Sequence, residues 1–401
     1  MRDNNKTILI FGGGINQLEL IREAQKIGVQ SIVIDPANNP PGKAEADFFY
    51  KVNGNDYKTT KEIAQKHGVN AIVTGQMEKP MRLMAKLAQE MGYIFHSPEV
   101  VERSLNKVLM KRTFLDHGIE CAKAITFNEN EEITSESIIN LSFPLIIKPA
   151  DAFSSRGVLK VSDFNELKAY EAETRSFSSN STLIVEEFLE GKEYSVECIT
   201  YRGETNVIQV TEKFITPYPN TVEIAHLQPA RITEQEKQQI EKLVKKAIDA
   251  IGIDNSASHA EVMLTNEGPK MIEIGARLGG DFISSYLTKA SCGVSMDRAS
   301  LQIALGLKPD IQKKHVNYSM VKYIELENGK IVSKILPINE IKKQTGFVFA
   351  HIFVNPGEKI EKITHSAQRP ACIIFKGNNE NVLMDRIYSG EQFLKTKILL
   401  Q

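Results

Sequence analysis

The chain has little of what marks several common classes of protein. Its four cysteines are scattered, without the spacing of a metal site or a disulfide framework, and this favours a reducing, cytoplasmic setting. No apolar stretch is long enough to cross a membrane, and residues 1–6 lack the apolar core of a signal peptide. The net charge is −1, and no long basic stretch indicates a nucleic-acid partner. We therefore expect neither a membrane protein nor a nucleic-acid binder.

The length of 401 residues suffices for two to four domains with ample core. Between Thr7 and Thr74, short β-branched runs alternate with helical stretches, which predicts a wound parallel sheet of the α/β class. Later strands bracket polar stretches, which predicts α+β modules. We expect four segments: a wound α/β domain at 1–110, a small module at 111–190, a larger domain at 191–320 and a C-terminal subdomain at 321–401.

Two glutamates in a predicted hairpin are the strongest chemical signal. Residues 259–264 and 270–274 alternate between apolar and polar side chains, and Asn266, Gly268 and Pro269 between them indicate a turn. With a turn centred on Glu267, Glu261 lies opposite Glu273 on one face, with Cβ atoms about 5 Å apart. Oxygen ligands at that spacing suit Mg²⁺. A surface hairpin with two solvated glutamates is the alternative.

A glycine turn after the first strand invites comparison with a dinucleotide site. Gly12 and Gly14 match the first two glycines of that fingerprint, and Asp35 ends the next strand. However, Gln17 stands where the third glycine or alanine belongs. We therefore favour a strand-to-helix turn whose amides line a substrate cleft over an NAD site.

Two lysines, a loop and a hinge follow in order along the chain. Lys107 begins a helical stretch, and Lys148 closes an apolar strand, where a lysine needs an anionic partner. The small polar residues at 149–158 have amides and hydroxyls that can fold over phosphates. Residues 185–194 read as strand, short link and strand, and such a link can hold a flat base by its edge. Taken singly, each lysine is better explained by solvation at the surface.

In combination these residues resemble the ATP-grasp superfamily over roughly residues 7–310. The shared order is helix lysine, strand-end lysine, small-residue loop, Glu-Glu-Phe-Leu-Glu-Gly hinge, two metal carboxylates and an arginine. The resemblance implies a wound N-terminal domain, a small lid domain and a larger catalytic domain. It also implies formation of an acyl phosphate, with transfer of the acyl group to an amine.

The resemblance assigns a role to each matched residue. The ATP phosphates would be contacted by Lys107 and Lys148 and covered by a lid loop at 151–157 with Ser154, Ser155 and Gly157. The adenine amino group would be bound by Glu186, and the ring edge by the backbone of Glu187, Phe188 and Leu189. The ribose would be bound by Glu193. Glu261 and Glu273 would hold Mg²⁺, or Mn²⁺ in its place. Arg277 would bind the transferring phosphoryl group or a substrate carboxylate.

The chain departs from the family pattern at the second metal position. Many members have Glu-x-Asn-x-Arg there, whereas Gly275 replaces the Asn in this chain. This departure and the serines of the lid loop resemble the amino-acid ligase branch more than the biotin carboxylase branch. His226 lies in a stretch similar to a substrate-facing segment of that branch, and either recognises substrate, shuttles a proton or is structural. His259 is expected to support the metal ligands.

These observations predict an ATP-dependent carboxylate–amine ligase that produces ADP and phosphate, with Arg277, Lys148 and His226 as catalytic residues. The partners would be a small carboxylic acid and an amine, and a homodimer is common in the family. Two alternatives stay open: a carboxyphosphate-forming enzyme, and a nucleotide-binding sensor that lost catalysis with the Asn.

Overall fold

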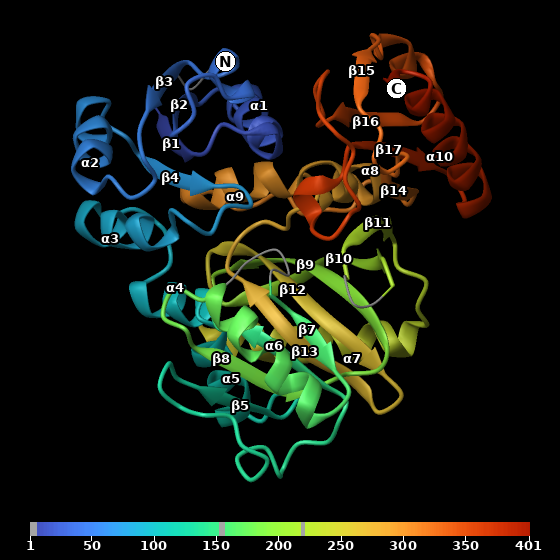
Figure 1. Ribbon diagram of the computed structural model, residues 1–401. Helices are drawn as coiled ribbons and strands as arrows, with labels where there is room; N and C mark the ends of the chain where they lie inside the picture. Colours follow the sequence, from blue (N-terminus) through green and yellow to red (C-terminus); the bar gives the residue numbers. More distant parts are fainter. Residues whose placement is uncertain (1–5, 152–156, 218–220) are drawn as a thin grey trace.

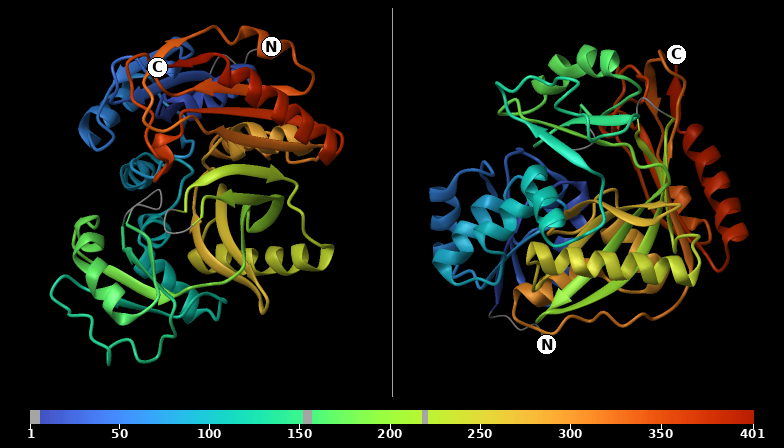
Figure 2. Two further views of the ribbon diagram at one scale, coloured as in Figure 1. Left: turned by 45° about the vertical axis from the view of Figure 1, so that its right-hand side comes forward. Right: turned by 90° about the horizontal axis from the view of Figure 1, so that it is seen from below.

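The computed structural model describes residues 6–151, 157–217 and 221–401. These residues form an eight-stranded sheet, two four-stranded sheets and one two-stranded sheet. Figure 1 shows the N-terminal and C-terminal parts side by side at the top and the central part below them. Two further views in Figure 2 show the small sheet as a separate layer from the large one. None of the helices in the described ranges could cross a membrane.

The N-terminal part is the predicted wound parallel sheet. Its strands are β1 (Thr7–Phe11), β2 (Gln30–Asp35), β3 (Phe48–Lys51) and β4 (Ala71–Thr74), and its helices are α1 (Leu18–Lys26), α2 (Tyr57–Lys66) and α3 (Met81–Met91), with 3₁₀ turns η1 (Ile15–Gln17) and η2 (Pro41–Ala44). The strands lie parallel in the order β3-β2-β1-β4. The helices α2 and α3 bury apolar side chains on one face, and α1 buries Leu20 and Ile21 on the other. The α/β prediction is confirmed.

A buried carboxylate joins this part to the centre of the protein. Glu23 of α1 is fully buried and accepts hydrogen bonds from Lys26 at 2.9 Å, Lys289 at 2.8 Å and Arg298 at 2.7 Å. Burial would raise the pKa of Glu23, but these three cations lower it to about 2. The ion cluster holds the N-terminal sheet against the central part of the protein, and the loop after β4 contributes residues to the site described below.

The small module is an antiparallel sheet covered by one helix. Its elements are β5 (Ala124–Phe127), β6 (Leu145–Pro149), β7 (Leu159–Val161), α6 (Phe164–Ser176) and β8 (Leu183–Glu187), and it follows the helices α4 (Pro98–Leu105) and α5 (Lys107–Asp116). The strand order is β5-β8-β6-β7. Asn106 caps α5 through hydrogen bonds from the amides of Val108 and Leu109, which explains why Lys107 lies at the first turn of that helix.

The large antiparallel sheet carries most of the site. Its strands are β9 (Lys192–Tyr201), β10 (Glu204–Ile215), β11 (Glu223–Gln228), β12 (Ser256–Thr265), β13 (Gly268–Gly275), β14 (Tyr318–Ile324), β16 (Phe347–Ile352) and β17 (Ala371–Gly377), in the order β13-β12-β9-β10-β11-β14-β17-β16. The helix α7 (Glu234–Ile251) packs on it with Ile240, Val244 and Ile248. As the sequence predicts, Thr233 and Glu236 form a capping box, and Gly252 ends the helix at φ +89°.

Three strands of the C-terminal part, β14, β17 and β16, complete that same sheet, whereas β15 (Val332–Ile335) and β18 (Ile398–Leu400) form a separate two-stranded sheet. The remaining elements, in chain order, are the π-helix η3 (Ile283–Leu287), α8 (Thr288–Cys292), α9 (Met296–Ala304), η4 (Asn339–Lys343), η5 (Ser366–Gln368) and α10 (Glu380–Lys395). The expected boundary at 320/321 falls inside β14, and the one at 110/111 falls inside α5. Hydrogen bonding between β11 and β14 makes the last segment continuous with the one before it.

Candidate functional site

The two hairpin glutamates lie opposite each other, as predicted, but the turn and the strand register that bring them together differ from those expected. The turn closes between Thr265 and Gly268, half a residue away from the expected centre at Glu267. A β-bulge at Ile272 inserts one residue into β13 and brings Glu273 opposite Glu261. Without the bulge, Glu261 would face Ile272. The opposition expected from the sequence is therefore confirmed.

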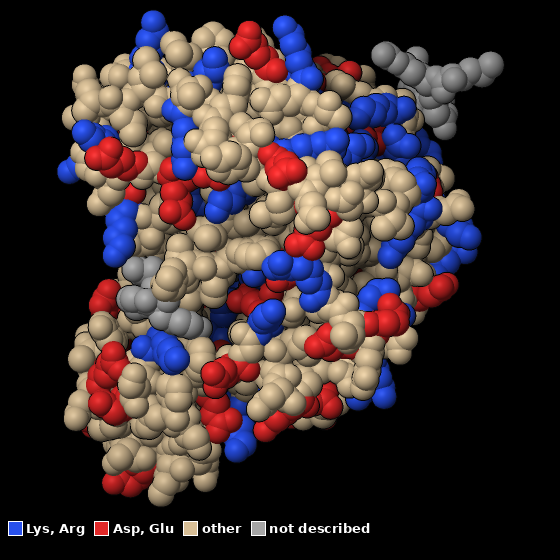
Figure 3. Space-filling model, turned by 90° about the vertical axis from the view of Figure 1, so that its right-hand side faces the viewer, with Lys and Arg blue, Asp and Glu red and all other residues tan. Residues whose placement is uncertain are grey.

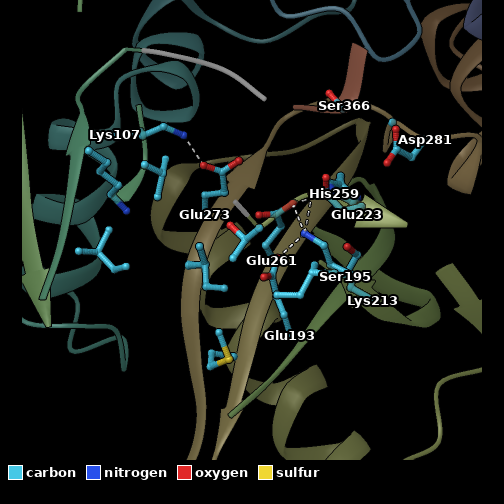
Figure 4. A pocket seen from close by; sticks show the side chains of 18 of the residues that line it. Lys107, Glu193, Ser195, Lys213, Glu223, His259, Glu261, Glu273, Asp281 and Ser366 are labelled. Carbon is cyan, nitrogen blue, oxygen red and sulfur yellow. Dashed lines mark hydrogen bonds and ion pairs between the residues drawn. The ribbon is translucent and has the colours of Figure 1, made fainter. Parts of the chain in front are cut away.

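Each of these carboxylates has a lysine as its counter-ion. Lys107 forms an ion pair with Glu273, and Lys213 of β10 lies 3.0 Å from Glu261 Oε1. The charge of Lys107 lowers the pKa of Glu273. Figure 4 shows the four side chains converging above the strands. Two facing carboxylates that attract cations from separate elements have the donor set that suits Mg²⁺.

Lys213 is a site residue that sequence reasoning missed. Its side chain is 3% exposed, and it pairs with Glu193 and lies 3.5 Å from Glu223 as well as close to Glu261. Burial alone would lower the pKa of Lys213, but the three glutamates raise it well above its ordinary value. A lysine within a strand of alternating apolar and polar residues could have indicated this, because a lysine that faces inward needs anionic partners.

The second expected lysine meets the hinge glutamate. Lys148 and Glu186, each 8% exposed, form an ion pair, and Lys111 Nζ lies 2.9 Å from the other oxygen of Glu186. Burial would raise the pKa of Glu186, but the two lysines lower it to about 2. Burial lowers the pKa of Lys148. The sequence placed both residues in one site, whereas Lys111 was not singled out.

Replacing Lys148 should weaken nucleotide binding. We expect Lys148→Ala to lower the affinity for ATP by about tenfold or more, because a phosphate loses a charged hydrogen bond of about 1.5–3 kcal/mol. The affinity is measured by titration calorimetry with ADP, which does not depend on turnover. Lys123→Ala is the matched control, since Lys123 is a mostly exposed lysine 3.7 Å from Glu187. Equal affinities in the two variants would contradict the assignment of Lys148.

Arg277 pairs with a residue from the N-terminal sheet. Its Nε donates to Glu78 Oε1 at 2.9 Å, and its Nη1 donates to the Leu278 carbonyl at 2.9 Å. Glu78 lies in the loop after β4, beside Gln76, Met77 and Lys79, and all four line the cavity. Ligands bind at this carboxyl end of the strands in many α/β sheets. That rule was the signal by which Glu78 could have been found.

His226 lies in the cavity wall and is held by an acidic neighbour. Its Nε2 donates to Asp281 Oδ2 at 3.0 Å, while its Nδ1 is buried without a hydrogen-bond partner among the described residues. Arg369, from the loop before β17, binds both oxygens of Asp281 at 2.8 and 2.7 Å and stacks 3.6 Å from the Tyr323 ring centroid. Asp281 and Arg369 were not predicted, because they come from segments far from His226 in sequence.

The hinge is formed as expected, and the phosphate loop is described only in part. Glu187, Phe188, Leu189 and Glu193 line the cavity, and the Phe188 amide donates to the Pro144 carbonyl at 3.0 Å. The predicted lid residues Ser154 and Ser155 lie outside the described residues. Gly157 has φ +73°, and a Cβ there would lie 2.7 Å from the Phe177 ring, so glycine is required.

The N-terminal glycines serve the fold of their own domain. The Gly13 amide donates to Asp35 Oδ2 at 2.8 Å, and the Ala37 amide donates to Asp35 Oδ1 at 2.7 Å. Both oxygens of the Asp35 carboxylate therefore accept hydrogen bonds from the backbone, whereas a dinucleotide site would use this carboxylate to bind the ribose. The turn is not among the residues that line the cavity, so the structure lends no support to the expectation that its amides face a substrate cleft. The loop after β4 takes that place.

One cavity of about 520 Å³ collects these residues. Its lining includes Lys107, Lys148, Glu186, Glu193, His226, Glu261, Glu273 and Arg277. Figure 3 shows acidic and basic side chains close together around a hollow on one face of the molecule. The volume is in the range of sites that enclose a nucleotide-sized ligand. No group of three acidic, histidine or cysteine residues in the described part of the chain could hold a metal by itself.

Comparison with known proteins identifies the central part of the chain. The family model of the ATP-grasp domain matches residues 141–285. The chain contains an ATP-grasp domain. The matched residues run from the strand of Lys148 through the hinge to Arg277. The family match therefore covers the site described above, apart from Lys107 and Lys111 of α5 and the residues that the N-terminal and C-terminal parts contribute.

A solved structure has the same fold over the whole chain, and two relatives are similar in sequence over all or half of it. An L-amino acid ligase from Bacillus licheniformis superposes with a TM-score of 0.82 over 100% of this chain and 99% of its own, at 21% identity. The formate-dependent phosphoribosylglycinamide formyltransferase of Saccharolobus solfataricus is 20% identical over 98% of both chains. The alanine–anticapsin ligase of Bacillus subtilis is 28% identical over 55% of this chain, which spans half of that ligase. The predicted ATP-grasp fold is confirmed.

Proposed function

We propose that this protein is an ATP-dependent carboxylate–amine ligase, which forms an amide through an acyl phosphate and releases ADP and phosphate. The observation that carries the proposal is a cavity lined by the paired carboxylates, Lys107, Lys148, Arg277 and the hinge residues. The relatives named ligases support this reading. The acid and the amine are small molecules, because the cavity must also hold the nucleotide.

The site fits a divalent metal ion held by Glu261 and Glu273. Both carboxylates already attract cations in this structure, and Mg²⁺ usually takes one or two protein carboxylates and completes its shell with water and phosphate. Mn²⁺ has similar ligand preferences and is expected to substitute. When bound, the metal supplies charge stabilisation to the phosphates during transfer. Gly275, where many family members have Asn, leaves two carboxylates as the protein ligands.

The nucleotide is expected along the hinge and the lysines. The amides of Glu187 and Phe188 already donate to the carbonyls of Lys123 and Pro144. The Leu189 amide is therefore the hinge amide that we expect to donate to the adenine edge. Glu193 would bind the ribose, and Lys148 would move from Glu186 to a phosphate. Glu186 keeps Lys111 as a counter-ion at 2.9 Å, which allows this exchange without leaving a bare buried charge.

The cations of the site are paired with carboxylates that substrates can replace. Lys107 pairs with Glu273 and Arg277 pairs with Glu78. A transferring phosphoryl group brings negative charge to Lys107 and Arg277, and preorganised cations stabilise the charge that develops there. Attack by a carboxylate oxygen on the γ-phosphorus forms the acyl phosphate and releases ADP. The amine then attacks the acyl carbon and phosphate leaves.

The second step also requires removal of a proton from the amine. His226 is our candidate for taking it, because Asp281 holds the imidazole at the cavity wall through a hydrogen bond to Nε2. Arg369 in turn holds Asp281 in place. From composition and resemblance we further propose a cytoplasmic homodimer, which sedimentation of the purified protein tests.

A second candidate acid follows from the relative that spans the whole chain. Because that relative is formate-dependent, formate belongs in the substrate screen. Bicarbonate belongs there as well, since a carboxyphosphate-forming enzyme would require it. Tight ATP binding without turnover on any acid would favour a nucleotide sensor over an enzyme.

The decisive experiment traps the intermediate. We expect hydroxylamine to yield a hydroxamate from ATP and the correct acid, together with ADP and phosphate, because an acyl phosphate reacts readily with this nucleophile. A matrix of amino acids, formate and bicarbonate, read by phosphate release, identifies the acid. Production of AMP and pyrophosphate would instead mean adenylate chemistry and would rule out an acyl phosphate.

A further inference from the structure

A buried carboxylate beneath the metal pair links two parts of the site. Glu197 of β9 is fully buried and lies directly opposite His259 of β12 in the sheet register. Because a carboxylate only accepts, His259 Nδ1 donates to Glu197 Oε1, at 2.6 Å. The other nitrogen of His259 lies 3.7 Å from Glu261 Oε1. Glu197 thus sets the orientation of the imidazole that faces the metal carboxylate.

The second oxygen of Glu197 holds a different segment. Ser284 Oγ donates to Glu197 Oε2 at 2.6 Å, and the Gly279 amide donates to Ser284 Oγ at 2.7 Å. Gly279 lies between Arg277 and Asp281. Through its two oxygens, Glu197 therefore connects β12, which carries Glu261, to the turn that carries Arg277.

The turn itself is strained and tightly packed on this carboxylate. Asp281 and Phe282 have φ of +51° and +63°, and a π-helix begins at Ile283. Residues in such conformations persist only where their surroundings hold them. A Cβ on Gly279 would lie 2.6 Å from His259 Nδ1 and 2.7 Å from Glu197 Oε2. The absence of a side chain at Gly279 lets the backbone approach the pair.

We propose that Glu197 is a positioning residue, which aligns Glu261 through His259 and the Arg277 turn through Ser284, so that metal and phosphoryl group meet in one geometry. The inference rests on the proposed function, because it assumes that Glu261 holds the metal. Glu197 does not line the cavity and acts only through its neighbours. Supporting residues of this kind orient the groups that bind a metal and tune their affinity.

The test measures how much Mg²⁺ strengthens ADP binding. The affinity for ADP is determined by calorimetry with Mg²⁺ and with EDTA, and the ratio of the two gives the contribution of the metal. In Glu197→Gln we expect this ratio to fall about tenfold or more, because loss of an outer partner typically costs 10–100-fold in metal affinity. The affinity in EDTA and the Tm should stay near those of the wild type.

Glu212→Gln is the matched control. Glu212 is a buried glutamate on the adjacent strand β10, and it pairs with Arg231 away from the cavity. An unchanged ratio in Glu197→Gln, or an equal loss of affinity with and without Mg²⁺ accompanied by a lower Tm, would overturn the proposal. If Glu197→Gln does not fold, Ser284→Ala is judged by the same two criteria. Absence of any Mg²⁺ effect in the wild type would instead contradict the proposed function.

Discussion

Glu273→Gln is expected to reduce turnover by about a thousandfold or more in a protein that stays folded. The substitution removes one of the two facing carboxylates and leaves Lys107 without its partner. Loss of a metal ligand removes several kcal/mol of transition-state stabilisation, and about 4 kcal/mol corresponds to a thousandfold change in rate. The fold should persist, because neutralising one of two opposed carboxylates relieves their repulsion in the strand pair.

The change is measured by ATP-dependent phosphate release at saturating Mg²⁺, with the Tm recorded for each variant. Glu267→Gln is the matched control, because Glu267 lies at the tip of the same hairpin and its side chain is 70% exposed. It pairs with Lys270 at 2.6 Å but does not line the cavity. Near-normal turnover in folded Glu273→Gln would mean that the glutamate pair is an ordinary feature of a hairpin.

Arg277→Lys should lower kcat by about a hundredfold, and Arg277→Met by still more. A lysine retains the charge but lacks the planar fork that meets two oxygens of a phosphoryl group or carboxylate at once. Removal of one preorganised donor to a developing charge typically costs 10²–10³ in kcat. Because the interaction is expected mainly in the transition state, the KM for ATP should change much less than kcat.

The arginine prediction has a control in Arg231, whose partner Glu212 lies on β10 of the large sheet. Arg231 also binds a glutamate through two nitrogens, with Nε at 2.8 Å and Nη2 at 2.7 Å from the oxygens of Glu212. Arg231→Lys should therefore disturb a comparable ion pair without touching the cavity. If Arg277→Lys and Arg231→Lys behave alike, Arg277 serves to join the two parts of the chain through Glu78, and its assigned role in catalysis is wrong.

Local patterns predicted the elements and the order of the chemistry. Alternation predicted β12 and β13, and a capping box with a closing glycine predicted α7. The succession of Lys107, Lys148 and the hinge indicated a nucleotide site before any contact was known. These features depend on neighbours in sequence, where the periodicity of side chains and the chemistry of helix ends act directly.

The sequence also led to the correct pair of glutamates through an incorrect register. It indicated two carboxylates on facing strands but did not reveal the bulge at Ile272 that brings them opposite each other. A bulge changes which residues oppose without changing the pattern of apolar and polar positions enough to be read from one strand. On its other side, β12 pairs with β9 without any shift in register, so the bulge is confined to the pairing with β13.

The sequence by itself determined the wound parallel sheet, the main strands and helices, and the types of residue expected to bind a nucleotide and a metal ion. Only the tertiary structure decided which charges meet. Four of these charged residues come from separate segments: Lys213, Glu78, Arg369 and Glu197. Sheet pairing or domain packing brings each of them against a residue that lines the cavity. A buried charge is stable only beside its partner, and that partner is fixed by strand order and by contacts between domains, which no local pattern encodes.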